Sequence, residues 1–193
     1  MAKKPKVRPR VGRSPNGKPG LRRPGIGKIV SGGQTGVDRA ALDFAIKRGI
    51  PHGGYCPKGR RSESGRIASK YRLTECASPD YAMRTELNVA HSDGTLILTR
   101  GRPEGGTQRT VYLCREYGKP ALVIDLDRKL KSADFAGWLH DHSIETLNVA
   151  GPRESKQSGV GKQARKALQE LFAAMEDSAA HRARIGEGVL TKP

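Results

Sequence analysis

Three strand-like segments of this chain are each followed directly by a glycine-rich segment and then by a helical pattern. Short apolar runs that alternate with amphipathic helices are typical of parallel strands joined by crossover helices. The chain is therefore predicted to be an α/β protein with a mostly parallel central sheet. The strands and their loops are Lys28–Ser31 with Gly32–Gly36, Thr95–Thr99 with Gly101–Gly106, and Thr146–Ala150 with Gly151–Ser155.

A further strand is expected at Ala121–Ile124. Periodicity disappears over Gly53–Leu73, which is expected to be a long, ligand-facing loop. The last helix has the clearest periodicity, with one apolar face made by Ala164, Ala167, Leu168, Leu171, Phe172 and Met175. This pattern stops at Asp177, so the sequence predicts one domain over residues 26–177 and a flexible C-terminal tail over 178–193.

The positive charge of the chain is concentrated at its N-terminus. Residues 1–28 hold ten Lys or Arg and no Asp or Glu, out of a net charge of +17 for the whole sequence. Residues 1–25 are also rich in Pro and Gly and poor in large apolar residues, which predicts a disordered basic tail. Such a tail could bind nucleic acid weakly through its charge, although a solvated tail is the simpler explanation.

Composition disfavours several other classes of protein. No stretch approaches the ~20 apolar residues of a membrane helix, and the first residues lack the apolar run of a signal peptide. The three cysteines, Cys56, Cys76 and Cys114, are too few and too scattered for a disulfide framework. Neither the cysteines nor the histidines have the spacing of metal ligands. We therefore predict a cytoplasmic protein with no membrane association and no protein-held metal site.

The glycine-rich loops should meet at the carboxyl edge of the sheet, where open α/β sheets bind ligands. Glycine lets the backbone approach a phosphate, and the N–H groups at a helix N-terminus attract the anion. The hydroxyls of Ser31, Thr35 and Thr107 can add hydrogen bonds. Each loop alone could be an ordinary tight turn, but three on one edge predict a site for a phosphate-bearing ligand.

The common nucleotide motifs are absent. No G-x-x-x-x-G-K-[ST] sequence occurs, because Gly161-Lys162 is followed by Gln163, and no G-x-G-x-x-G opens the first helix. A kinase-like or ordinary dehydrogenase mechanism is therefore disfavoured.

Six motifs between Ile26 and Met175 resemble one family in sequence and in order. They are Ser31–Asp43, Gly54–Arg60, Arg84–Val89, Ser92–Leu96, Gly105–Thr107 and Asn148–Ser155. This pattern is similar to that of the putative molybdenum carrier proteins, circularly permuted YpsA-like members of the SLOG superfamily. The resemblance implies a Rossmann-like three-layer sandwich and a ligand of the nucleotide or molybdenum-cofactor type, the latter being a pterin that carries a phosphate.

The resemblance does not extend to one known reaction of related proteins. Cytokinin-activating phosphoribohydrolases of the LOG type have a P-G-G-x-G-T-x-x-E loop, whose glutamate serves in cleavage of the glycosidic bond. Here Thr110 stands where that glutamate would be. Hydrolysis by that route is therefore not expected.

The candidate ligand-binding residues lie in or beside these motifs. Asp38 could accept a hydrogen bond from a ribose or pterin, or merely interact with the helix dipole. Arg60, Arg61 and Arg84 could clamp a phosphate, or be solvated or paired. The predicted ligand-binding residues are Ser31, Gly32, Gly33, Gln34, Thr35, Gly36, Asp38, Arg39, Arg60, Arg84, Asn88, Gly105, Gly106, Thr107, Gly151 and Arg153.

Three glutamates, Glu63, Glu86 and Glu154, are the candidate acids or bases if the protein catalyses a reaction. The alternative for each is a salt bridge with one of the many arginines. Cys56 could contact a molybdenum centre, but a buried cysteine more often behaves as a small hydrophobe.

Two functions follow from these patterns. The favoured one is a binding or carrier protein for a phosphate-bearing small molecule, either molybdenum cofactor or a nucleotide-like ligand. The alternative is a hydrolase that acts on an N-glycosidic or phosphoester bond of a nucleotide-like metabolite. A homo-oligomer is compatible with both, and nucleic acid would bind only weakly, through the basic tail.

Overall fold

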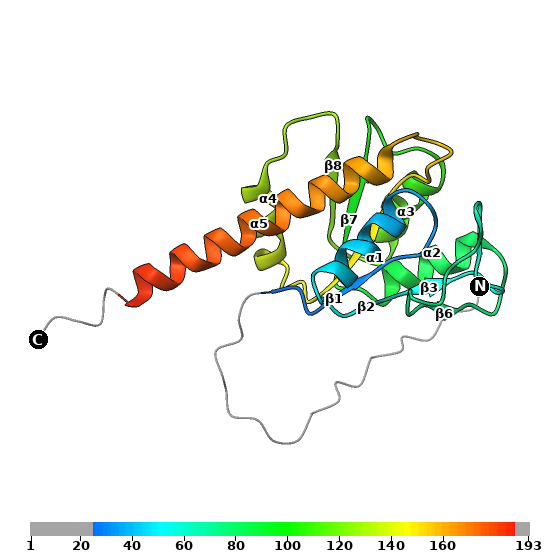
Figure 1. The fold of residues 1–193 in the computed structure, drawn as a ribbon, viewed down its shortest axis with the longest axis horizontal. Coiled ribbons are helices and arrows are strands. Elements are labelled where there is room, and N and C mark those ends of the chain that lie inside the picture. Colours follow the sequence, from blue (N-terminus) through cyan, green and yellow to red (C-terminus); the bar gives the residue numbers. More distant parts are fainter. Residues whose placement is uncertain (1–24, 188–193) are drawn as a thin grey trace, which may run out of the picture.

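The sheet at the centre of the protein has five parallel strands. The computed structural model describes residues 25–187, with side chains as far as Glu176, so the predicted basic tail up to residue 24 and residues 188–193 lie outside the described residues. The strand order is β2-β1-β9-β7-β8, and Figure 1 labels β2, β1, β7 and β8 of these. The strands are β1 (Lys28–Val30), β2 (His52–Gly53), β7 (Gly94–Thr99), β8 (Ala121–Asp125) and β9 (Thr146–Ala150).

Helices flank this sheet in two groups. Helices α1, α4 and α5 pack on one another around the main core, whereas α2 packs on α3, and α3 contacts β7. The predicted α/β, Rossmann-like class is confirmed by the parallel sheet and its crossover helices. The helices are α1 (Val37–Lys47), α2 (Tyr81–Ala90), α3 (Gly105–Glu116), α4 (Ser132–Asp141) and α5 (Val160–Glu187).

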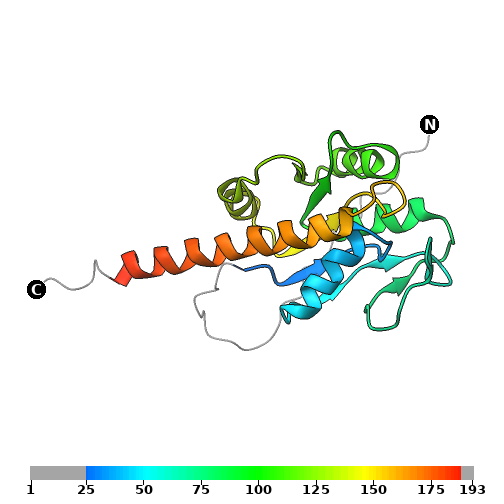
Figure 2. The ribbon, with the colours of Figure 1, turned by 45° about the horizontal axis from the view of Figure 1, so that its top comes forward.

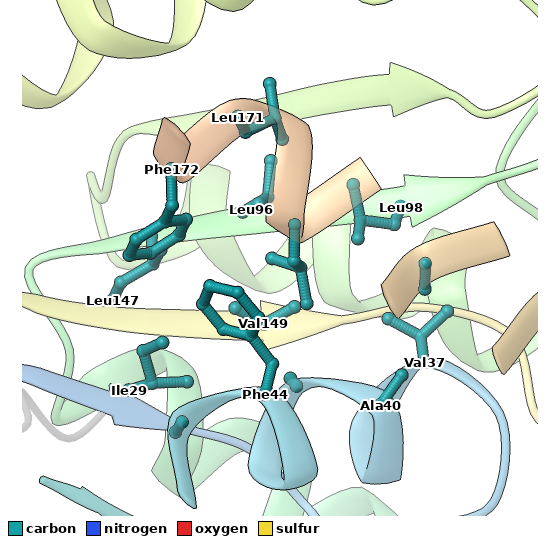
Figure 3. Packing of buried hydrophobic residues seen from close by; sticks show 14 of the residues in the cluster. Ile29, Val37, Ala40, Phe44, Leu96, Leu98, Leu147, Val149, Leu171 and Phe172 are labelled. Carbon is teal, nitrogen blue, oxygen red and sulfur yellow. The ribbon is translucent and has the colours of Figure 1, made fainter. Parts of the chain in front are cut away.

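Alternating residues of the central strands form the floor of the main core. Leu96 of β7 and Leu147 of β9 lie under the apolar face of α5, as Figure 3 shows. Phe172 of α5 meets Phe44 of α1 edge to face, with ring centroids 4.8 Å apart. The alternating residues of the strands therefore meet the apolar face that was predicted for the last helix, and together they form one core.

Leu171 gives a direct test of this packing. Its side chain is fully buried in the core, and truncation to alanine leaves a cavity that the surrounding side chains fill only in part. We expect Leu171→Ala to lower the free energy of unfolding by about 2 to 5 kcal/mol. Urea denaturation measures this loss. A change below about 0.5 kcal/mol, as at surface sites, would show that α5 does not pack in this way.

The region predicted to be a long loop is more structured than expected. It contains β3 (Tyr55–Cys56), which pairs with β6 (Thr74–Glu75), and a hairpin of β4 (Arg61–Ser62) and β5 (Gly65–Arg66). Ile67, Tyr71 and Leu73 are buried beneath it in a second apolar cluster with Leu42 and Cys56. Strands of two residues are too short to show periodicity, so the sequence pattern could not reveal them.

One strand and one helix boundary differ from the prediction. The fifth sheet strand, β2, was missed because it also has only two residues. The predicted end of the last helix at Asp177 is wrong, because α5 continues to Glu187 and projects beyond the body of the protein (Figures 1 and 2). Residues 178–187 are rich in Ala and Arg, which favour helix even without an apolar face. Within the described chain, no helix is both long and apolar enough to cross a membrane.

Candidate functional site

A cleft of about 380 Å³ opens at the carboxyl edge of the sheet. Its walls come from the loop after β1, one face of α2, the start of α3, and the end of β9 with the loop that follows. This is the edge at which the glycine-rich loops were predicted to meet. The lining residues are Gly32, Gln34, Asp38, Tyr81, Ala82, Arg84, Thr85, Asn88, Glu104, Gly105, Gly106, Thr107, Arg109, Thr110, Asn148, Val149, Ala150, Gly151, Pro152, Arg153, Lys156 and Gln157.

The N-terminus of α3 faces this cleft without a side-chain cap. Glu104 occupies the N-cap position, and its carbonyl accepts hydrogen bonds from the N–H groups of Thr107 and Gln108 at 3.0 and 3.2 Å. The N–H groups of Gly105 and Gly106 donate to no other residue in the described part of the chain. A Cβ added at either glycine would meet nothing within 4 Å. Free N–H groups at a helix N-terminus beside open space are the arrangement to which anions commonly bind in proteins.

The loop after β1 is instead held by hydrogen bonds within the loop and by close contacts with neighbouring segments. The N–H of Gln34 donates to Asp38 Oδ2 at 3.2 Å, and the N–H of Thr35 donates to Gln34 Oε1 at 3.0 Å. Gly33 has a φ of 74°, and a Cβ there would lie 2.5 Å from Leu73 Cδ1. A Cβ at Gly36, with a φ of 72°, would lie 2.5 Å from the carbonyl oxygen of Pro152. Both glycines therefore serve tight packing of the loop.

A buried ion pair joins α1 to α2 at the base of the cleft. Arg84 Nη1 donates to Asp38 Oδ2 at 2.8 Å, and the Asp38 side chain is almost fully buried. Burial raises the pKa of Asp38, whereas the Arg84 charge and the Gln34 N–H act in the opposite direction. A Cβ at Gly32 would lie 1.5 Å from Arg84 Nη1. Gly32 thus makes room for the guanidinium.

Positive charge dominates the cleft. Arg84, Arg109, Arg153 and Lys156 line it, against the acids Asp38 and Glu104. Two of the guanidinium groups also lie near the Tyr81 ring, with Cζ of Arg153 5.8 Å and Cζ of Arg84 6.0 Å from its centroid. The cleft therefore combines cations with one aromatic surface.

The structure brings many of the predicted ligand-binding residues to the cleft. Those that line it are Gly32, Gln34, Asp38, Arg84, Asn88, Gly105, Gly106, Thr107, Gly151 and Arg153. Those that do not are Ser31, Gly33, Thr35, Gly36, Arg39 and Arg60.

Arg60 shows why some of the predicted residues lie elsewhere. Its guanidinium donates to four carbonyl oxygens, those of Ile67, Ala68, Tyr71 and Leu73, at 2.9 to 3.1 Å. These bonds hold the segment after the β4–β5 hairpin in place. Four of its five N–H donors are used in this way and Arg60 does not line the cleft, which indicates a structural role.

Comparison with known proteins agrees with this arrangement. The model of the circularly permutated YpsA SLOG family matches residues 29–172. The chain belongs to this family. A crystal structure described as a putative molybdenum carrier protein from Syntrophus aciditrophicus is 48% identical, with a TM-score of 0.72 over 76% of this chain and 94% of that one.

Two other comparisons add nothing to the family assignment. (E)-4-Hydroxy-3-methyl-but-2-enyl diphosphate reductase is 11% identical, with a TM-score of 0.34 over 78% of this chain and 61% of that one, which is too distant to carry an argument. The search of curated proteins gave no match.

The three candidate catalytic glutamates of this family member all lie outside the cleft lining. Glu63 accepts hydrogen bonds from Thr35 and Ser155, and Arg153 lies 3.8 Å away. Partial burial raises the pKa of Glu63, but the hydrogen bonds from Ser155 and Thr35 outweigh it, so the net pKa is lowered. Glu86 accepts from Tyr117, and Glu154 accepts from the N–H groups of Gly159 and Gly161 at the start of α5. All three have structural partners.

Sequence reasoning missed Tyr81, Arg109 and Lys156. A signal for Tyr81 was present, because Tyr81, Arg84 and Asn88 recur at the spacing of one helix face. Arg109 follows Gly105 by four residues, so it lies on the same face of α3 as that glycine. Lys156 gave no such signal, because it lies in a loop whose path follows only from tertiary packing.

Proposed function

We propose that this protein binds or carries a phosphate-bearing small molecule, either molybdenum cofactor or a nucleotide-like compound. The uncapped N-terminus of α3 carries this proposal, because the free N–H groups of Gly105 and Gly106 open into a cleft lined by cations. A phosphate there would accept two backbone hydrogen bonds and interact with the helix dipole. Arg109 and Lys156 line the same cleft and would add charge-assisted contacts. The 48%-identical relative described as a putative molybdenum carrier supports molybdenum cofactor as the first candidate.

The residues of the cleft suit the organic part of that cofactor better than its metal. Among the residues that the structure describes, no three His, Cys, Asp or Glu side chains are grouped to hold a metal ion. Cys56, the thiol considered from the sequence, is fully buried in the second apolar cluster. The phosphate would lie at α3, and the Tyr81 ring would offer a flat surface to a pterin or purine. The cargo would therefore be held by its phosphate and ring.

No observation favours the hydrolase alternative. A general acid or base must lie within hydrogen-bonding reach of the reacting atoms. The three predicted glutamates all lie outside the cleft lining, and each is engaged by partners of its own. We therefore retain binding without turnover as the proposed function.

A matched pair of ligands tests the phosphate site. We expect calorimetric titration to show binding of molybdenum cofactor or of AMP. If AMP binds, adenosine should bind at least about tenfold more weakly, because it lacks the group that accepts charge-assisted hydrogen bonds. Mass spectrometry of the gently purified protein should find a retained phosphate-bearing compound. Equal affinity for AMP and adenosine would overturn the proposal. The proposal would also fail if molybdenum cofactor, AMP and NAD all failed to bind and no compound were retained on the purified protein.

A further inference from the structure

Two side chains that line the cleft hold buried hydrogen-bond donors for which the described part of the chain offers no acceptor. These donors are Gln34 Nε2 and Arg84 Nε. A buried donor without an acceptor is costly, so native proteins usually satisfy such a group with protein, water or a ligand. The other two buried polar atoms of this kind among the described residues, in Arg39 and Gln163, belong to side chains that do not line the cleft.

The orientation of the Gln34 amide is fixed by the backbone around it. Its Oε1 accepts hydrogen bonds from the N–H of Thr35 and from the N–H of Glu63 at the tip of the β4–β5 hairpin, both at 3.0 Å. Only the oxygen of an amide can accept from two N–H groups, so the NH₂ group must occupy the other position. Because Gln34 is only 5% exposed, this donor is held in place beside the cleft.

Asp38 brings the two unpartnered donors to the same end of the cleft. Its Oδ2 accepts both the Gln34 N–H at 3.2 Å and Arg84 Nη1 at 2.8 Å. The same carboxylate compensates the charge of Arg84. This end of the cleft therefore offers hydrogen-bond donors without net positive charge. Such a surface suits a neutral acceptor, for example a carbonyl oxygen, better than a second phosphate.

We propose that Gln34 and Arg84 bind a ring carbonyl of the ligand, so that the ligand is a phosphate ester of a fused ring with a carbonyl group, as in a pterin or a 6-oxopurine. This inference rests on the proposed function, which places the phosphate at the start of α3. A small rotation of either side chain toward the cleft brings its free N–H to the carbonyl oxygen. Adenine has an amino group in place of that carbonyl, and its N–H groups would face the donors of Gln34 and Arg84. A site built to hydrogen-bond one group discriminates strongly against an analogue that lacks it.

IMP and AMP are a matched pair for this test, because they share the ribose phosphate and differ in a carbonyl or an amino group on the purine. Calorimetric titration of the full-length protein should show IMP binding at least about tenfold more tightly than AMP. A pterin that carries one phosphate is titrated beside IMP, and the tighter of the two identifies the ring system. If neither binds more tightly than AMP, the two donors serve water alone and the inference is wrong. Equal affinity for IMP and inosine would instead contradict the phosphate site and the proposed function.

Gln34→Glu separates recognition of the carbonyl from general damage to the cleft. The variant keeps an acceptor oxygen for the N–H groups of Thr35 and Glu63 but replaces the NH₂ donor by a second oxygen. At about pH 8, where glutamate is ionised, the ratio of IMP to AMP affinity should fall at least about fivefold. Structural damage would weaken both nucleotides alike and leave this ratio unchanged. Gln163→Glu is the matched control, because Gln163 also holds a buried unpartnered atom but does not line the cleft. An unchanged ratio in Gln34→Glu, or an equal fall in Gln163→Glu, would exclude Gln34 as the residue that selects the ring.

Discussion

Replacing Gly106 by valine is expected to abolish binding of the phosphate-bearing ligand while the protein remains folded. A Cβ at Gly106 meets no protein atom within 4 Å, so the valine methyl groups would occupy the space in front of the free N–H groups of α3. A phosphate could then no longer reach those donors. Calorimetry should be done with whichever of molybdenum cofactor and AMP the wild type binds. We expect the affinity to fall at least about a hundredfold, which corresponds to roughly two lost charge-assisted hydrogen bonds.

Gly33→Val is the contrasting variant for this prediction. Gly33 has a positive φ, and its added side chain would collide with Leu73 and Ile67. Its main effect should therefore be a lower thermal midpoint, whereas Gly106→Val should keep the midpoint within a few degrees of wild type. If Gly106→Val binds as tightly as wild type, the glycines at the start of α3 form a structural turn and the phosphate site is misplaced.

The sequence predicted the fold well where apolar patterns were long enough to be specific. The buried run Thr95–Thr99 lies within β7, and the apolar face of α5 packs on it in the main core. The carboxyl-edge position of the loops follows from parallel strands alone, so the location of the cleft was also predictable. The strands of two residues and the extension of α5 were not, because neither has a distinct hydrophobic period.

The separate roles of the glycines could not be predicted from composition. Gly33, Gly36 and Gly106 look alike in sequence, but the first two have positive φ and approach other parts of the chain closely, whereas the third borders open space. Arg60 was misassigned for a similar reason. A guanidinium can bind a phosphate or a set of carbonyl groups, and only the folded loop brings four carbonyls to it.

Replacing Arg84 by methionine is expected to be among the most destabilising changes at the cleft. Methionine keeps most of the length of the side chain but removes the only cation that forms an ion pair with Asp38 among the described residues. Asp38 is only 3% exposed, so its carboxylate would remain buried without a counter-charge. Breaking a buried pair in this way costs about 3 to 5 kcal/mol. Urea denaturation at about pH 8, where the carboxylate form is most favoured, should show this loss.

The loss caused by Arg84→Met should shrink as the pH falls. Burial already raises the folded-state pKa of Asp38 above its unfolded value, and removing Arg84 raises this pKa further. A carboxyl group with a raised folded pKa favours the folded state at low pH, and this contribution is lost as the pH rises through the folded pKa. The difference between variant and wild type should therefore be smaller at about pH 5 than at about pH 8. Asp38→Asn combined with Arg84→Met removes both charges and should recover most of the stability at the higher pH. A pH-independent loss, or a double variant as unstable as Arg84→Met alone, would show that the ion pair does not control stability here.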